Sequence, residues 1–257
     1  VAAFTNDQVA ALTTNQALSL KTAQVTALTT GQVVSLTTDQ VSNLLTAQLA
    51  SLTTKQVVAI ETDDLQALTT AQLVTMTTAQ MAALTTDQVV ALTTDQAVSL
   101  ETSQLAALTT AQTATLETDD LQAVTTAQMQ TMTTLQMAVL KTAQMVALTT
   151  DQVSNLTTAQ VAGLTTAQVA AMSTVQLVAL TTDQALGLKS TQLAALTTAQ
   201  VQAVETEDLV VLTTTQLKGL TTTQMANLTT AQIVSMGTEQ LAGLSTAQIE
   251  SMKTAQV

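Results

Sequence analysis

The sequence predicts an all-α solenoid, a superhelix of short capped helices with one helix in each eight-residue repeat. The repeat runs through the chain without an insertion or a deletion. The residue types kept at its eight positions match a helix with one buried face. A Thr-Thr pair opens most repeats, and Thr is a residue that begins helices.

The octads start at Thr5 and end at Met252, which gives 31 full units. Partial units stand at both ends: Val1 to Phe4 resembles the tail of one octad, and Lys253 to Val257 the head of another. No linker or shift of composition divides the array, so we expect residues 1–257 to form a single continuous repeat domain. The partial units also suggest a segment of a longer array.

Within the octad, labelled a to h so that Thr5 is a and Leu12 is h, some positions are restricted. Position b is almost always Thr, and d is Gln except at Asp64, Asp120 and Asp208. Position e is nearly always Val, Leu, Met or Ile, h is always aliphatic or Met, and g is small. Positions a, c and f accept charged, polar or apolar residues. We expect the restricted positions to be packed or hydrogen-bonded and the permissive ones to face water.

A helix explains this sorting better than a strand. At about 100° per residue, d, e and h fall in one arc, while c and f lie opposite. A strand would mix permissive and restricted positions on both of its faces. A β-solenoid with several octads per coil is the alternative. One continuous helix is excluded, because eight residues make about 2.2 turns and the apolar face would rotate by roughly 80° per octad.

Each octad must therefore begin a new helix. We expect Thr at b to be the N-cap, with a helix of about six residues from c to h. The alternative places the cap at a, where Thr and the Gln at d would form a capping box. Because Lys, Glu and Leu also occur at a and are poor caps, b is preferred. Gln at d, on the edge of the buried face, is expected to bond to free backbone groups of the next unit.

The charge and composition exclude several classes of function. The formal net charge is −12, from six basic and eighteen acidic residues. Nucleic acids and anionic membranes attract clustered cations, so neither is an expected partner. Thr and Gln interrupt every apolar run well before the roughly 18 residues of a membrane span, so we expect no membrane insertion.

The usual catalytic reagents are missing as well. The chain has no His and no Cys, and therefore no ordinary neutral-pH general base, thiolate nucleophile or zinc ligand set. A near-uniform repeat also provides no single unusual constellation of groups. We expect no enzyme activity and no catalytic, cofactor-binding or metal site.

Three octads are acidic at a, c and d together. Clustered carboxylates without a basic neighbour suit calcium, but no loop Gly or ligand spacing of a known calcium motif accompanies them. Acids favoured by a helix N-terminus are the preferred interpretation. The residues are Glu61, Asp63 and Asp64; Glu117, Asp119 and Asp120; and Glu205, Glu207 and Asp208.

The unit Thr-Thr-x-Gln-Val-x-x-Leu resembles the short Thr/Gln/Leu-rich repeat tracts of large bacterial surface and secreted fibre proteins. The resemblance implies an extracellular or cell-surface location, self-association between copies of the array, and a place in the cell surface or matrix. The function expected is that of a structural fibre, filament or adhesin stalk. The alternative is an α-solenoid module that binds a peptide or glycan. Such modules usually carry aromatic or Arg anchors, which are nearly absent here.

Overall fold

The structure is a computed structural model that describes residues 3–252, and these residues form helices and turns without a strand. The predicted all-α solenoid is confirmed, and the β-solenoid alternative is wrong. The partial end units reach into residues 1–2 and 253–257, which lie outside the described residues. The chain divides into two compact units, Val1–Met132 and Thr133–Val257. That residues 1–257 act as one domain stays a prediction.

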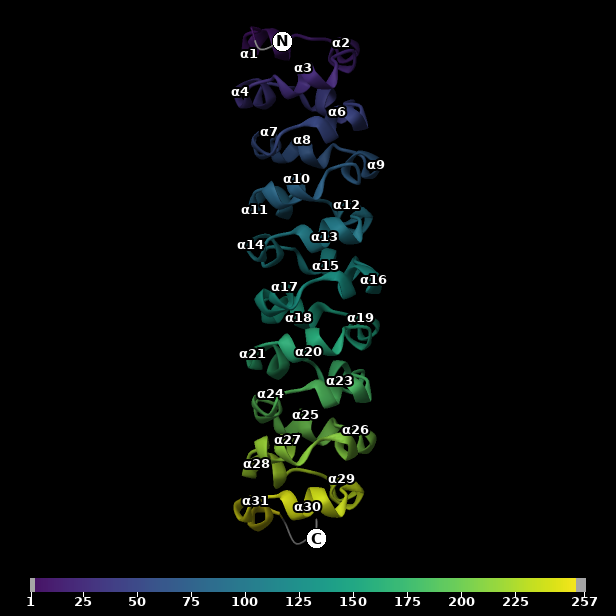
Figure 1. Cartoon of the computed structure of the whole chain (residues 1–257), viewed down its shortest axis with the longest axis vertical. Helices are drawn as coiled ribbons and strands as arrows, with labels where there is room; N and C mark the ends of the chain where they lie inside the picture. The colour runs from purple at the N-terminus through teal and green to yellow at the C-terminus, as the bar shows by residue number, and fades with distance from the viewer. Residues whose placement is uncertain (1–2, 253–257) are drawn as a thin grey trace. The chain divides into compact units, whose positions relative to one another are not determined.

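The helices of the first unit begin every eight residues (Figure 1). They are α1 Asn6–Ala10, α2 Thr14–Leu18, α3 Thr22–Thr26, α4 Thr30–Val34, α5 Thr38–Ser42, α6 Thr46–Ser51, α7 Thr54–Val58, α8 Thr62–Gln66, α9 Thr70–Leu73, α10 Thr78–Ala83, α11 Thr86–Val90, α12 Thr94–Ser99, α13 Thr102–Ala107, α14 Thr110–Thr113, α15 Thr118–Ala123 and α16 Thr126–Thr131.

The second unit continues the same spacing. Its helices are α17 Thr134–Val139, α18 Thr142–Ala147, α19 Thr150–Ser154, α20 Thr158–Gly163, α21 Thr166–Ala171, α22 Thr174–Val178, α23 Thr182–Gly187, α24 Ser190–Ala194, α25 Thr198–Ala203, α26 Thr206–Val211, α27 Thr214–Gly219, α28 Thr222–Met225, α29 Thr230–Ser235, α30 Thr238–Gly243 and α31 Thr246–Ser251.

The N-cap of each helix is position a, so the prediction of a cap at b was wrong. In α11 the Thr85 hydroxyl accepts a hydrogen bond from the Gln88 backbone N–H at 3.1 Å. The Gln88 side-chain oxygen accepts one from the Thr85 backbone N–H at 2.8 Å. This is the capping box that the sequence offered as the alternative. The helices accordingly run from b to about f or g, not from c to h.

Residues with poor capping side chains are tolerated at a because one of the two bonds of the capping box needs only their backbone N–H, which donates to the Gln side chain at d. Leu45 offers no side-chain acceptor, yet its N–H donates to the Gln48 side-chain oxygen at 2.8 Å. Gly237 does the same to Gln240 at 2.9 Å. A Gln at d therefore caps the start of the helix whatever residue stands at a.

Positions d, e and h form the buried face, as predicted. In the octad of α11, Gln88, Val89 and Leu92 are all buried. The permissive c positions are mostly exposed and the f positions are exposed or half-buried. Almost every octad places an apolar residue at e and another at h. The core of each compact unit therefore consists of successive layers of aliphatic and Met side chains.

Helices stack on one another at intervals of three octads. In the first unit α13 contacts α10 and α16, and in the second α24 contacts α27 (Figure 1). Between coils, the shortest hydrogen bond of the Gln88 side chain reaches the carbonyl oxygen of Ile60, 28 residues earlier, at 2.7 Å. One coil therefore takes about three and a half octads, a value that the repeat length alone does not provide.

This stacking explains why position g is small. A Cβ on Gly219 would lie 2.6 Å from the Ser190 Cβ, at position b of the coil before. A Cβ on Gly243 would lie 2.8 Å from the Thr214 Cγ2 in the same way. The b residue of the previous coil thus limits the size of the side chain at position g.

Candidate functional site

The most regular feature inside each unit is a row of buried glutamines at position d, which we call the glutamine ladder. In the first unit the Gln88 amide nitrogen donates to the carbonyl oxygens of Val57 at 2.9 Å and Ile60 at 2.7 Å, and more weakly to that of Val58 at 3.4 Å. In the second unit Gln184 does the same to Val153 at 3.0 Å and Leu156 at 2.5 Å.

The ladder satisfies the carbonyl groups that each helix leaves free at its C-terminal end. The acceptors of Gln88 are at e, f and h of the octad that begins four repeats earlier, and other glutamines of the ladder use two or three of these positions. The carbonyl at e already accepts the N–H of h in its own octad, as that of Val57 does from Ile60 at 3.1 Å. The short helix leaves the carbonyls at f and h for other partners. The prediction that Gln at d bonds to free backbone groups was right, but its partner is the previous coil, not the next unit along the chain.

The three acidic octads interrupt the ladder. Asp64, Asp120 and Asp208 take the place of Gln at d and are buried like the glutamines. Asp120 accepts a hydrogen bond at 2.8 Å from the hydroxyl of Thr94, at position b of the octad three units earlier. Thr38 and Thr182 bond to Asp64 and Asp208 in the same relation. The acids at a and c of these octads are exposed, so the structure does not bring three carboxylates into one chamber.

Burial raises the pKa of all three d aspartates above the ordinary value of 3.8. For Asp120, the hydrogen bond from Thr94 lowers the pKa, and the charges of Glu117 and Asp119 raise it further. Desolvation is the largest cause in each case, because a buried carboxylate loses water that one hydroxyl does not replace.

The threonine donors were missed in the sequence. Position b is Thr in nearly every octad, so Thr38, Thr94 and Thr182 carry no local signal that separates them from the other b residues. Only the coil length, which places b of one octad against d of another 26 residues later, identifies them.

A second consequence concerns the carbonyl groups that face these aspartates. Gln at d would donate to the h carbonyl 28 residues before it, which for the three aspartates belongs to Leu36, Leu92 and Leu180. Within residues 3–252 no side chain donates to these carbonyl oxygens. An acceptor has replaced a donor at a buried position.

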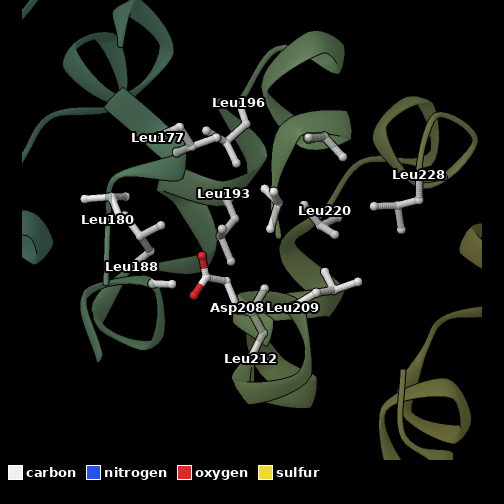
Figure 2. Close-up of a pocket in the computed structure, with 13 residues that line it drawn as sticks. Leu177, Leu180, Leu188, Leu193, Leu196, Asp208, Leu209, Leu212, Leu220 and Leu228 are labelled. Atoms are coloured by element: carbon white, nitrogen blue, oxygen red, sulfur yellow. The ribbon is translucent and has the colours of Figure 1, made fainter. Parts of the chain in front are cut away.

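A cavity of about 30 Å³ lies in the second unit next to one of these places. Figure 2 shows the Asp208 carboxylate among the leucine side chains that line it. Leu177 and Leu180, from the octad four units before Asp208, are part of the wall. The first unit has a smaller cavity of about 10 Å³, lined only by aliphatic residues.

Across the described part of the chain, no group of three or more His, Cys, Asp or Glu residues is placed to hold a metal ion. In the same residues, no helix is both long and apolar enough to cross a membrane. The predictions of no catalytic, cofactor-binding or metal residue stay predictions.

The fold and its ladder define a helical repeat protein with solenoid architecture. The model of the ALTTAQ repeat family matches residues 57–94, 113–150, 134–166, 153–190 and 201–238. Since these matches cover more than half of the chain, the chain belongs to the ALTTAQ repeat family. A search of curated proteins finds no match. Every matched stretch contains several octads, so the unit of the family model is longer than the eight-residue structural repeat.

Proposed function

We propose that this repeat protein is a structural spacer, a fibre, filament or adhesin stalk that acts at the cell surface or outside the cell. It catalyses no reaction and binds no nucleic acid, and copies of the array associate with one another. The observation that supports the proposal best is the glutamine ladder, because it joins each coil to the one before it by the same hydrogen bonds.

A ladder of this kind suits a spacer. An octad with Gln at d bonds to carbonyls of an octad in the previous coil and offers its own carbonyls to a later octad. Stability is then a sum of nearly equal units and interfaces, so octads can be added without a change of fold. Length is the property that repeat number controls.

The surface supports a spacer more than a recognition module. Position c varies freely and is exposed, and it holds Asp, Ala, Lys, Gly or Thr in different octads. Phe4 is the only aromatic residue of the chain, and there is no Arg. Binding hot spots depend on such anchors. An acidic net charge also keeps an extended surface well hydrated.

Electron microscopy of length variants tests the proposal. A duplicate of residues 37–92 adds seven octads, which equals about two coils of 28 residues. We expect the particles to lengthen by a constant step at unchanged width. Insertion of an equally long Gly/Ser segment is the control, and it should give two folded pieces with a flexible gap.

Native material would distinguish a spacer from a binding module. Filaments of uniform width on intact cells, reached by antibodies without lysis, are the expected result. Discrete monomers that bind a peptide or glycan in a screen of immobilised peptides and glycans would overturn the proposal.

A further inference from the structure

Where a ladder glutamine donates to e, f and h, three carbonyl oxygens of one octad converge on its amide nitrogen. In the second unit the Gln184 amide nitrogen lies 3.0 Å from the Val153 oxygen, 3.2 Å from that of Ser154 and 2.5 Å from that of Leu156. These oxygens stand at the C-terminal end of a helix, where the helix dipole is negative. The place where these carbonyl oxygens meet therefore favours a group with positive charge or a polarised N–H.

Asp208 places an acceptor at the equivalent position d, in a cavity that Leu177 and Leu180 also line. The carbonyls that a glutamine there would contact are those of Leu177, Val178 and Leu180. The Leu177 oxygen accepts the Leu180 N–H at 3.2 Å, and no side chain within residues 3–252 donates to any of the three. Asp is also one methylene shorter than Gln, so its side chain reaches less far from the backbone than the amide that it replaces.

The charges around Asp208 make this arrangement costly without a cation. Glu205 and Glu207 are the charged residues that act on it, and both raise the pKa of its carboxyl. Thr182 supplies a single hydroxyl. A buried carboxylate needs a partner of opposite charge or a proton.

The cavity supplies room for such a partner. It measures about 30 Å³ and is lined by Asp208, Leu177 and Leu180 together with other aliphatic residues (Figure 2). This volume suits one ion or one water, not an organic molecule. One carboxylate neutralises one positive charge, so a monovalent ion leaves no net charge among the leucines, whereas a divalent ion would.

We propose that Asp208 and the carbonyl oxygens of Leu177, Val178 and Leu180 bind one dehydrated monovalent cation of the potassium or sodium class. Carbonyl oxygens replace the hydration shell of such ions in other proteins. By their position in the repeat, Asp64 and Asp120 are expected to bind the same ion with the carbonyls of Leu36 and Leu92. The exposed acids at a and c are not ligands, so this site differs from the calcium cluster considered from the sequence. The proposal is independent of the spacer function.

Thermal unfolding of the full chain in different chlorides at constant ionic strength is the first test. We expect the Tm in KCl or NaCl to exceed that in N-methyl-D-glucamine chloride, whose cation is too large for the cavity, by about 3 °C or more. The triple variant D64Q/D120Q/D208Q restores the ladder residue at all three positions. It should fold, and its Tm should not distinguish the three salts.

The matched control removes the exposed acids instead. The variant E61Q/D63N/E117Q/D119N/E205Q/E207Q loses more charge but keeps the three buried aspartates, so its dependence on the cation should remain. Crystals soaked in rubidium chloride provide a direct readout, with anomalous peaks beside Asp64, Asp120 and Asp208 in the parent chain and none in the triple variant.

Equal Tm values of the parent chain in all three salts, or rubidium peaks that are absent or confined to the exposed acids, would overturn the proposal. A dependence on pH without any dependence on the cation would also overturn it, and would mean that a proton neutralises the aspartates.

Discussion

Two neighbouring stretches of the second unit, around Gln184 and around Asp208, have the same backbone and opposite polar chemistry. Gln184 accepts from the N–H that starts its own helix and donates to the coil before it. Asp208 is equally buried but can only accept, and it takes a hydroxyl from Thr182. The comparison shows that the ladder depends on the two-sided amide, which caps one helix and satisfies the end of another.

The largest effect should come from shifting the ladder out of register. Deletion of Thr85–Gln88 joins Leu84 to Val89 and changes the spacing between later glutamines and their carbonyls. Three pairs span the junction, those of Gln96, Gln104 and Gln112. With about 1–3 kcal/mol for each buried group left unpaired, we expect a loss of roughly 3–9 kcal/mol, measured by chemical denaturation.

Deletion of the whole octad Thr85–Leu92 is the control. It keeps every glutamine in register, so it should cost only one unit and one interface. Proteolysis should cut near the junction in the four-residue deletion alone. Equal tolerance of both deletions would mean that the octad is not a structural unit.

Removal of one ladder amide should have the next largest effect. Gln96→Ala deprives Leu65 and Leu68 of bonds at 3.0 and 2.8 Å and leaves the Thr93 N–H without its acceptor. We expect the free energy of unfolding to fall by about 2–4 kcal/mol. Gln66→Ala makes the same chemical change at an exposed f position and should stay within about 0.5 kcal/mol. Similar losses for both would show that the ladder does not stabilise the coil.

Conversion of an aspartate octad into a glutamine octad should stabilise the chain. Asp120→Gln supplies an amide to the Leu92 carbonyl and removes a buried charge, at the small cost of the Thr94 hydrogen bond. We expect a gain of about 1–2 kcal/mol in a buffer without small monovalent cations. A loss of stability in that buffer would contradict the comparison between the two kinds of octad.

The sequence contained enough information for the fold class and the buried face. Eight residues do not close an integral number of helical turns, so a continuous helix was excluded, and the restricted positions d, e and h identified the core. The sequence favours a cap at b because Lys, Glu and Leu, such as Leu45, occur at a and are poor caps through their side chains. The structure shows that a poor side chain at a does not exclude the cap there, because the backbone N–H of the residue at a can donate to the Gln side chain at d.

The hydrogen-bond partner of each glutamine could not be predicted from the sequence, for a different reason. The pairing of Gln88 with Ile60 depends on the length of one coil, and this length follows from how short helices pack across turns, not from any single octad. For the same reason the Thr94 to Asp120 pair, 26 residues apart, had no counterpart in the repeat pattern.

The smallest expected effect is a pH dependence that separates the two kinds of octad. Burial raises the pKa of Asp120 in the folded chain above 3.8, so the folded state holds its proton to a higher pH than the unfolded state does. The stability that this proton contributes is complete below the unfolded pKa and is lost as the pH rises through the folded pKa. The Gln variant has no proton to lose at this position.

The advantage of Asp120→Gln over the parent chain should therefore grow as the pH rises from below 3.8 and level off once Asp120 is ionised in the folded state. Glu117 and Asp119 contribute by raising the pKa of Asp120, so the variant E117Q/D119N should narrow the pH range over which the advantage grows. Thr94→Val removes the bond that lowers this pKa and should widen that range. Urea unfolding of the variants in a potassium-free buffer at several pH values measures these shifts. An advantage that is independent of pH would mean that Asp120 keeps an ordinary pKa in the folded chain.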